Sequence, residues 1–110
     1  MNSKKLDIVL ETGIDFRMPF TLYDNNGNII DLSGATVDAQ LRQYEESADY
    51  FPFEVTHNGK GGRILMSMSH DLTAKIPYTT GVYDVRVTFS DGFIAKPMEG
   101  EVAIVPSATR

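Results

Sequence analysis

The stretch Gly81-Val82-Tyr83-Asp84-Val85-Arg86-Val87-Thr88-Phe89, followed by Ser90-Asp91-Gly92, decides the fold class of this chain. Apolar and polar residues alternate in it, so an extended strand places four apolar side chains on one face: Tyr83, Val85, Val87 and Phe89. Asp-Gly between two alternating runs is a strong β-hairpin signal, because glycine accepts the positive φ of a tight turn. We therefore predict an antiparallel hairpin whose apolar face, Tyr83 included, is buried.

Further alternating runs precede the hairpin, at residues 6–10, 14–22, 36–44, 53–56 and 63–69, and residues 29–30 predict one more short strand. Pro19 has no N–H to donate to a ladder, so its strand should lie at a sheet edge or carry a bulge. Residues 69–76 predict one helical turn that is capped by Ser69 and ended by Pro77.

This density of strands in 110 residues, with no linker or repeat, indicates a single domain over residues 1–110. We expect an all-β fold, an immunoglobulin-like antiparallel β-sandwich of about seven strands with one short helical turn. Two interpretations of Tyr83 stay open. It forms the tyrosine corner of such sandwiches, in which the hydroxyl bonds to upstream backbone, or it is simply the first core residue of its strand.

Composition excludes several classes of function. The formal net charge of −5 disfavours a nucleic-acid partner, because binding to phosphates needs a basic face. The chain has no cysteine, so a disulfide framework and thiolate chemistry are excluded. Ile8-Val9-Leu10 is too short for the apolar region of a signal peptide, and no run is long enough to cross a membrane. We expect synthesis in the cytoplasm and no membrane insertion.

Two loops resemble ligand sites but fail on spacing. The glycine-rich loop at residues 58–63 lacks the spacing of a phosphate-binding loop, and a strand rather than a helix follows it. Asp24, Asn26 and Asn28 have the alternate spacing of a calcium loop, but the glycine and glutamate that such a loop needs further on are absent. A hairpin loop and a tight turn are the favoured interpretations.

The two histidines, His57 and His70, are the remaining candidates for metal or acid–base chemistry. A site made of both with Asp71 is conceivable, but no spacing presents two ligands on one face. Ser69, His70 and Asp71 are the residue types of a hydrolase triad, yet sequence neighbours cannot converge in triad geometry. We therefore expect no enzyme, no catalytic, cofactor-binding or metal-binding residue, and no cofactor.

An acidic segment ends in an aromatic cluster, which is either a surface for a partner or carbohydrate or a loop folded over one end of the sandwich. The other surfaces are discouraged, because Pro19 blunts one edge and two like charges, Glu99 and Glu101, lie on the last strand. Aromatic side chains are common anchors of interfaces. We therefore take the cluster as a tentative interface: Tyr50, Phe51 and Phe53.

The order of motifs carries a family resemblance. The opening, Phe20-Thr21-Leu22-Tyr23-Asp24, Gly27 and Ile30-Asp31-Leu32-Ser33-Gly34-Ala35-Thr36-Val37, resembles that of small bacteriophage tail domains, among them baseplate upper-protein N-terminal domains. The closing half, Ile76-Pro77, Gly81-x-Tyr83-Asp84-Val85, Asp91-Gly92 and Gly100-x-Val102-x-Ile104-x-Pro106-x-x-Thr109-Arg110, is similar to the β-sandwich family of tail-fibre collar and connector proteins of phages and prophages. Residues 45–58 match neither pattern.

The resemblance implies a non-enzymatic virion structural protein, an adaptor or connector at the tail or tail-fibre attachment. The implied location is the virion tail, and the implied partners are copies of the chain itself in a homo-oligomer and other tail or tail-fibre proteins. Closed symmetry lets one small surface recur around a ring, and repeated weak contacts gain avidity. The alternative is a receptor- or carbohydrate-binding module of the tail.

Overall fold

The computed structural model describes residues 4–109, so residues 1–3 of the basic N-terminal stretch and Arg110 of the closing motif lie outside the described residues. Eight strands and two short helical segments make up this part of the chain. In chain order they are β1 (Lys4–Lys5), β2 (Ile8–Glu11), β3 (Phe16–Thr21), β4 (Thr36–Arg42), β5 (Phe51–His57), η1 (Gly59–Gly61), β6 (Arg63–Met68), α1 (His70–Thr73), β7 (Thr80–Thr88) and β8 (Ile94–Val105).

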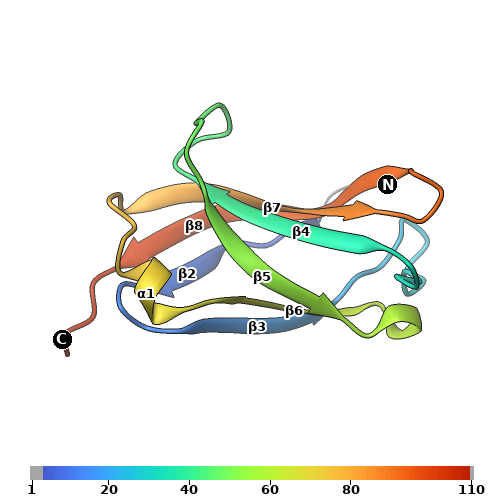
Figure 1. Ribbon diagram of the computed structural model, residues 1–110, viewed down its shortest axis with the longest axis horizontal. Helices are drawn as coiled ribbons and strands as arrows, with labels where there is room; N and C mark the ends of the chain where they lie inside the picture. The colour runs from blue at the N-terminus through green and yellow to red at the C-terminus, as the bar shows by residue number, and fades with distance from the viewer. Residues whose placement is uncertain (1–3, 110) are drawn as a thin grey trace.

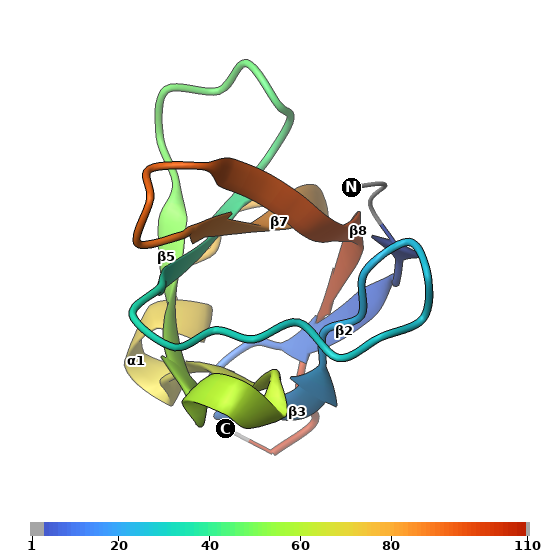
Figure 2. The same ribbon diagram turned by 90° about the vertical axis from the view of Figure 1, so that its right-hand side faces the viewer.

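The strands form the two layers of an all-β sandwich, which confirms the expected fold class. β8, β7 and β4 lie in one layer and β3 and β6 in the other (Figure 1). β5 crosses between them: Phe53 pairs with Ala39 of β4, whereas Glu54, the next residue, pairs with Ser67 of β6. Seen from the end, β5 closes one side of the sandwich and β2 lies near the other side (Figure 2).

The predicted hairpin is β7–β8. Gly92 takes a φ of 89° in the turn, and Phe89 N–H donates to the carbonyl of Phe93 at 2.8 Å. Of the face expected to be buried, the side chains of Tyr83, Val85 and Val87 are buried and Phe89 is half-buried. Because these residues lie on a central strand, their inward side chains meet those of the opposite layer.

The sandwich is not wholly antiparallel, which corrects one detail of the expectation. β1 and β2 both run parallel to β8, in the registers Lys5↔Glu99 and Ile8↔Val102. β8 is therefore an interior strand, and the argument that Glu99 and Glu101 blunt a free edge is wrong. The edge position of Pro19 is confirmed, since β3 pairs only with β6 within residues 4–109.

The core lies between the inner faces of the two layers. The residues expected to face inward from β4 and β6 are buried: Val37, Ala39, Leu41, Ile64, Met66 and Met68. The expected short strand at residues 29–30 is only an isolated bridge between Ile29 and Tyr23.

The predicted helical turn is α1, but its cap differs from the expectation. Ser69 is the N-cap residue and its side chain makes no capping bond. The carboxylate of Asp15 supplies the bond instead, because its Oδ1 accepts the His70 backbone N–H at 2.6 Å from the turn between β2 and β3. Thr73, buried in α1, receives the Gly13 N–H and donates its hydroxyl to the Ile14 carbonyl at 2.9 Å. These contacts hold the turn against α1.

Candidate functional site

A loop of residues 43–50, between β4 and β5, stands clear of the sandwich (Figures 1 and 2). Arg42, at the end of β4, holds this loop in place. The guanidinium donates to the carbonyl oxygens of Ser47 and Ala48, and to Gln40 Oε1 at 2.8 Å. The same group lies over the Tyr50 ring, 4.9 Å from its centroid. A loop ordered in this way loses less conformational entropy when it binds a partner.

The structure separates the three aromatic residues of the tentative interface. Tyr50 is 48% exposed and belongs to the projecting loop. Phe51 is half-buried, with its ring centroid 6.4 Å from that of Tyr78. Phe53 is only 6% exposed and packs against Phe16 and Tyr83, so its assignment to an interface is wrong. It faces inward because it pairs with the buried Ala39 of β4, and residues directly opposite each other in a ladder share one face of the sheet.

Tyr44 is an exposed aromatic residue of this loop that sequence reasoning missed. It is 55% exposed and lies in the same loop as Tyr50. A signal was available, because the alternating run predicted at residues 36–44 puts Tyr44 on the face opposite to the inward Leu41. In the structure β4 ends at Arg42, and Tyr44 lies in the loop that follows. The exposed aromatic pair of the loop is thus Tyr44 and Tyr50.

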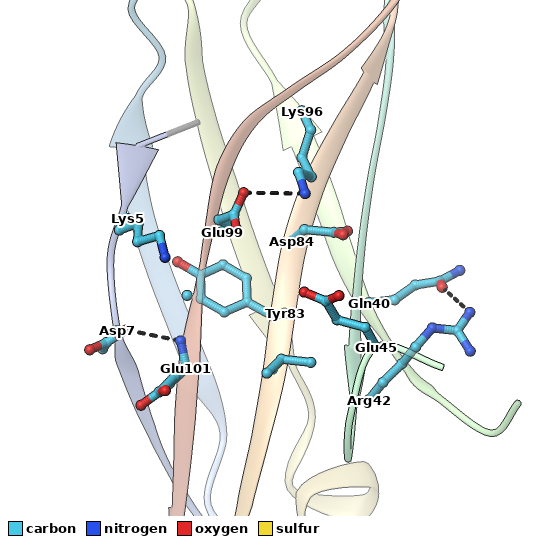
Figure 3. Close-up of a pocket in the computed structure, with 12 residues that line it drawn as sticks. Lys5, Asp7, Gln40, Arg42, Glu45, Tyr83, Asp84, Lys96, Glu99 and Glu101 are labelled. Atoms are coloured by element: carbon cyan, nitrogen blue, oxygen red, sulfur yellow. Dashed lines mark hydrogen bonds and ion pairs between the residues drawn. The ribbon is translucent and has the colours of Figure 1, made fainter. Parts of the chain in front are cut away.

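The outer surface beside this loop is a charged hollow of about 570 Å³ (Figure 3). It lies over β4, β7 and β8 and is bounded by the segment from β1 to β2 on one side and by Glu45 of the loop on the other. Five carboxylates and three cations line it: Asp7, Glu45, Asp84, Glu99 and Glu101, and Lys5, Arg42 and Lys96.

Lys96 is surrounded by carboxylates within this hollow. Its Nζ lies 3.2 Å from Glu99 Oε2, and the side chains of Asp84 and Glu45 extend toward the same region (Figure 3). The bond to Glu99 raises the pKa of Lys96 most, and the charges of Glu99, Asp84 and Glu45 add to it. Lys96 is half-exposed, so water screens these interactions. The ion pair itself joins two residues of β8, Lys96 and Glu99.

Tyr83 also lines the hollow, and its hydroxyl group has a structural role. Its hydroxyl donates to the Leu6 carbonyl at 2.5 Å. Burial, and to a lesser extent the charge of Asp7, raises the pKa of Tyr83 to about 12. The hydroxyl therefore stays protonated at neutral pH. The tyrosine-corner interpretation is wrong, because the acceptor lies 77 residues away rather than in the preceding connection.

The two loops that resemble ligand sites use their polar groups internally. Asp24 Oδ1 accepts the backbone N–H groups of Asn26 and Asn28, both at 2.9 Å, which makes the segment a tight turn. In the glycine-rich loop, Asn58 Oδ1 accepts the Arg63 N–H at 3.0 Å, and Gly62 N–H bonds to the Gly59 carbonyl at 3.1 Å. Both loops are therefore built as connections between strands.

The two histidines lie in separate surroundings. His57 Nε2 is 2.9 Å from the Ala35 carbonyl, and its Nδ1 accepts the Gly59 N–H, so this ring joins two loops. His70 Nδ1 is 3.0 Å from Asp15 Oδ1, and its Nε2 is 3.4 Å from Asp71 Oδ1. Within residues 4–109 no group of three or more His, Cys, Asp or Glu side chains is arranged to hold a metal ion.

Comparisons with known proteins bear on the fold alone. No family model and no curated protein sequence matches the chain. A crystal structure of the SrpA adhesin R347E mutant from Streptococcus sanguinis is similar, with a TM-score of 0.55 and 11% sequence identity. The similarity covers 91% of this chain but 55% of the adhesin chain, so the present chain spans about half the length of that protein. No helix in residues 4–109 has the length and apolar character needed to span a membrane.

Proposed function

We propose that this chain is a non-enzymatic structural protein of a phage or prophage virion, an adaptor or connector at the tail or tail-fibre attachment. The observation that carries the proposal is the loop of residues 43–50, which is braced by Arg42 and exposes Tyr44 and Tyr50. A compact sandwich with one pre-ordered, aromatic projection suits a part whose task is to hold other proteins. The resemblance between the order of motifs in this chain and that in phage tail domains supports a role in the virion tail.

The mechanism is geometric. In a homo-oligomer around a tail axis each copy presents its loop in the same orientation, so a weak contact is repeated around the ring. Repetition raises the overall affinity without any new chemistry, because later contacts form at a high effective concentration. The partners are copies of the chain and other tail or tail-fibre proteins, and the site of action is the virion tail after synthesis in the host cytoplasm.

Assembly with the products of the neighbouring genes tests this proposal. The chain is co-expressed with each of them, and the mass of every complex is measured by size-exclusion chromatography with light scattering. We expect a complex of defined stoichiometry, weakened by the double variant Tyr44→Ser, Tyr50→Ser. The matched control is Tyr23→Ser, which removes a tyrosine of similar exposure from a different loop. A chain that stays monomeric beside every neighbouring tail protein overturns the adaptor function.

The second candidate is a receptor- or carbohydrate-binding module. Exposed tyrosine rings beside a polar hollow favour it, since such rings stack on apolar faces while polar groups provide hydrogen bonds. A glycan-array signal that Tyr50→Ser abolishes and Tyr23→Ser preserves would favour this candidate over the adaptor.

A further inference from the structure

Within residues 4–109 no strand or helix covers the outer face of β4, β7 and β8, and the charge of the hollow on this face is unbalanced. Five carboxylates and three cations line the hollow on this face. The cations are largely engaged: Arg42 bonds to the loop and to Gln40, and Lys96 pairs with Glu99. A group that enters the hollow therefore meets an excess of negative charge, in particular from Glu45, Asp84 and Glu101.

The hollow and the projecting loop are parts of one surface. Glu45 belongs to the loop and lines the hollow, and Arg42 lines the hollow and stacks on Tyr50. A partner that packs against Tyr50 therefore lies beside the hollow and its carboxylates. The volume of about 570 Å³ is within the range of small-molecule sites, which is room for more than one side chain.

We propose that this face docks a basic segment of a partner protein, whose lysine or arginine side chains enter the hollow between Glu45, Asp84 and Glu101 while the segment packs against Tyr50. The proposal rests on the adaptor function and names the chemical class of its partner. Charge complementarity decides against a second copy as the occupant, because the chain carries a net charge of −5 and the face itself is acidic. Copies of the chain would then contact each other elsewhere.

The experiment titrates the full chain with two probes: a short peptide of alternating threonine and lysine, and the same peptide with glutamate in place of lysine. Backbone amide NMR shifts locate the binding face. We expect saturable shifts in residues 43–50 and around Asp84 and Glu101 with the lysine peptide only. The affinity should fall as salt is added, because exposed charges are screened.

Two double variants distinguish binding in the hollow from non-specific attraction of the peptide to any acidic surface. Glu45→Gln with Asp84→Asn removes two carboxylates from the hollow, and Glu11→Gln with Glu54→Gln removes two exposed carboxylates elsewhere. Both change the net charge equally. We expect the first pair to weaken binding about fivefold, the size of losing two partly exposed ion pairs, and the second pair to leave it unchanged.

Equal weakening by both double variants, or shifts spread over all acidic residues, would overturn the proposal in favour of non-specific attraction. Self-association that maps to this face would overturn it in favour of a second copy. Its failure is separable from that of the adaptor function, since a chain that ignores the lysine peptide can still assemble with tail proteins through Tyr44 and Tyr50.

Discussion

The hydroxyl of Tyr83, in the centre of β7, donates a hydrogen bond of 2.5 Å to the backbone carbonyl of Leu6, in the segment between β1 and β2. β8 lies between these two residues, so the bond spans β8 and connects the segment from β1 to β2 with β7. Leu6 N–H bonds in turn to the Glu99 carbonyl at 2.9 Å, and Asp7 Oδ1 accepts the Glu101 N–H. The break between β1 and β2 therefore leaves these backbone groups paired.

The first prediction separates the hydroxyl of Tyr83 from its ring. Tyr83→Phe keeps the buried ring and leaves the Leu6 carbonyl without its partner, so we expect a loss of about 1–3 kcal/mol in the free energy of unfolding. Tyr83→Ala should cost about 3–5 kcal/mol, because it also creates a cavity. Denaturant titrations of both variants measure the difference. A Tyr83→Phe protein as stable as the parent would mean that the bond contributes nothing.

The second prediction concerns Gly100, which lies beneath the same crossing. A Cβ there would overlap the Leu6 carbonyl and come within 3.0 Å of the Tyr83 ring. Gly100→Ala should therefore displace the segment from β1 to β2 and cost about 1–3 kcal/mol of stability, as overpacking does. Hydrogen exchange at the Leu6 and Glu101 amides should accelerate. Gly61→Ala serves as a comparison at a distant site, because the atoms nearest its Cβ belong to the side chain of Asn58, so exchange at the Leu6 and Glu101 amides should not change there.

The third prediction is a pH dependence of the contact between Asp15 and His70. The hydrogen bonds from the backbone and the ring of His70 lower the pKa of Asp15 below its ordinary 3.8, and the charge of Arg17 adds slightly. The bond to Asp15, and then the charge of Asp71, raises the pKa of His70 above 6.5. The carboxylate contributes stability above pH 3.8 that is lost as pH falls through its lower pKa. The imidazolium contributes below pH 6.5, and this is lost as pH rises through its raised pKa.

The contact should therefore be strongest between pH 3.8 and pH 6.5, where both Asp15 and His70 are charged. An NMR titration that measures the pKa of His70 tests it. Asp15→Asn retains an oxygen that can accept the His70 backbone N–H, but it lacks the charge. We expect the pKa of His70 to fall toward 6.5 in this variant, and to fall less in Asp71→Asn, because Asp71 is the weaker cause. An unchanged pKa in Asp15→Asn would contradict the assigned ion pair.

The fourth prediction separates the loop from the core. Phe53→Ala should cost about 3–5 kcal/mol of stability, because it removes a buried ring. Tyr50→Ala should cost about 0.5–1 kcal/mol, the size of an exposed cation–π contact with Arg42. Thermal and denaturant unfolding of the two variants measure both costs. If Tyr50→Ala unfolds the protein, the loop is part of the core and the interface lies elsewhere.

The fifth prediction is that a chelator leaves the melting temperature unchanged. The carboxylate of Asp24 already accepts two backbone N–H groups, and the rings of His57 and His70 are bonded in different places. We expect no stoichiometric zinc or calcium by elemental analysis of the purified chain. A fall of several degrees with chelator would show that one of these groups binds a metal ion.

Much of the sandwich followed from local pattern. Residues 80–88 alternate because one face of β7 is buried and the other is solvated, and Asp91-Gly92 turns because glycine takes a positive φ there. The inward positions of β4 and β6 were predictable for the same reason. Each of these features depends on neighbours in the sequence, so a periodicity of two was sufficient to find it.

The candidate site, by contrast, was decided by tertiary structure. Alternation does not say which strand a segment pairs with, so neither the parallel pairing of β1 and β2 with β8 nor the crossing of β5 was visible. Those pairings bring Asp7, Glu45, Asp84 and Glu101 around one hollow and turn Phe53 inward. The sequence determined the strands and the exposed, acidic character of the loop. Contacts between distant residues, such as Tyr83 with Leu6 and His70 with Asp15, decided which side chains meet, because they depend on how the layers pack.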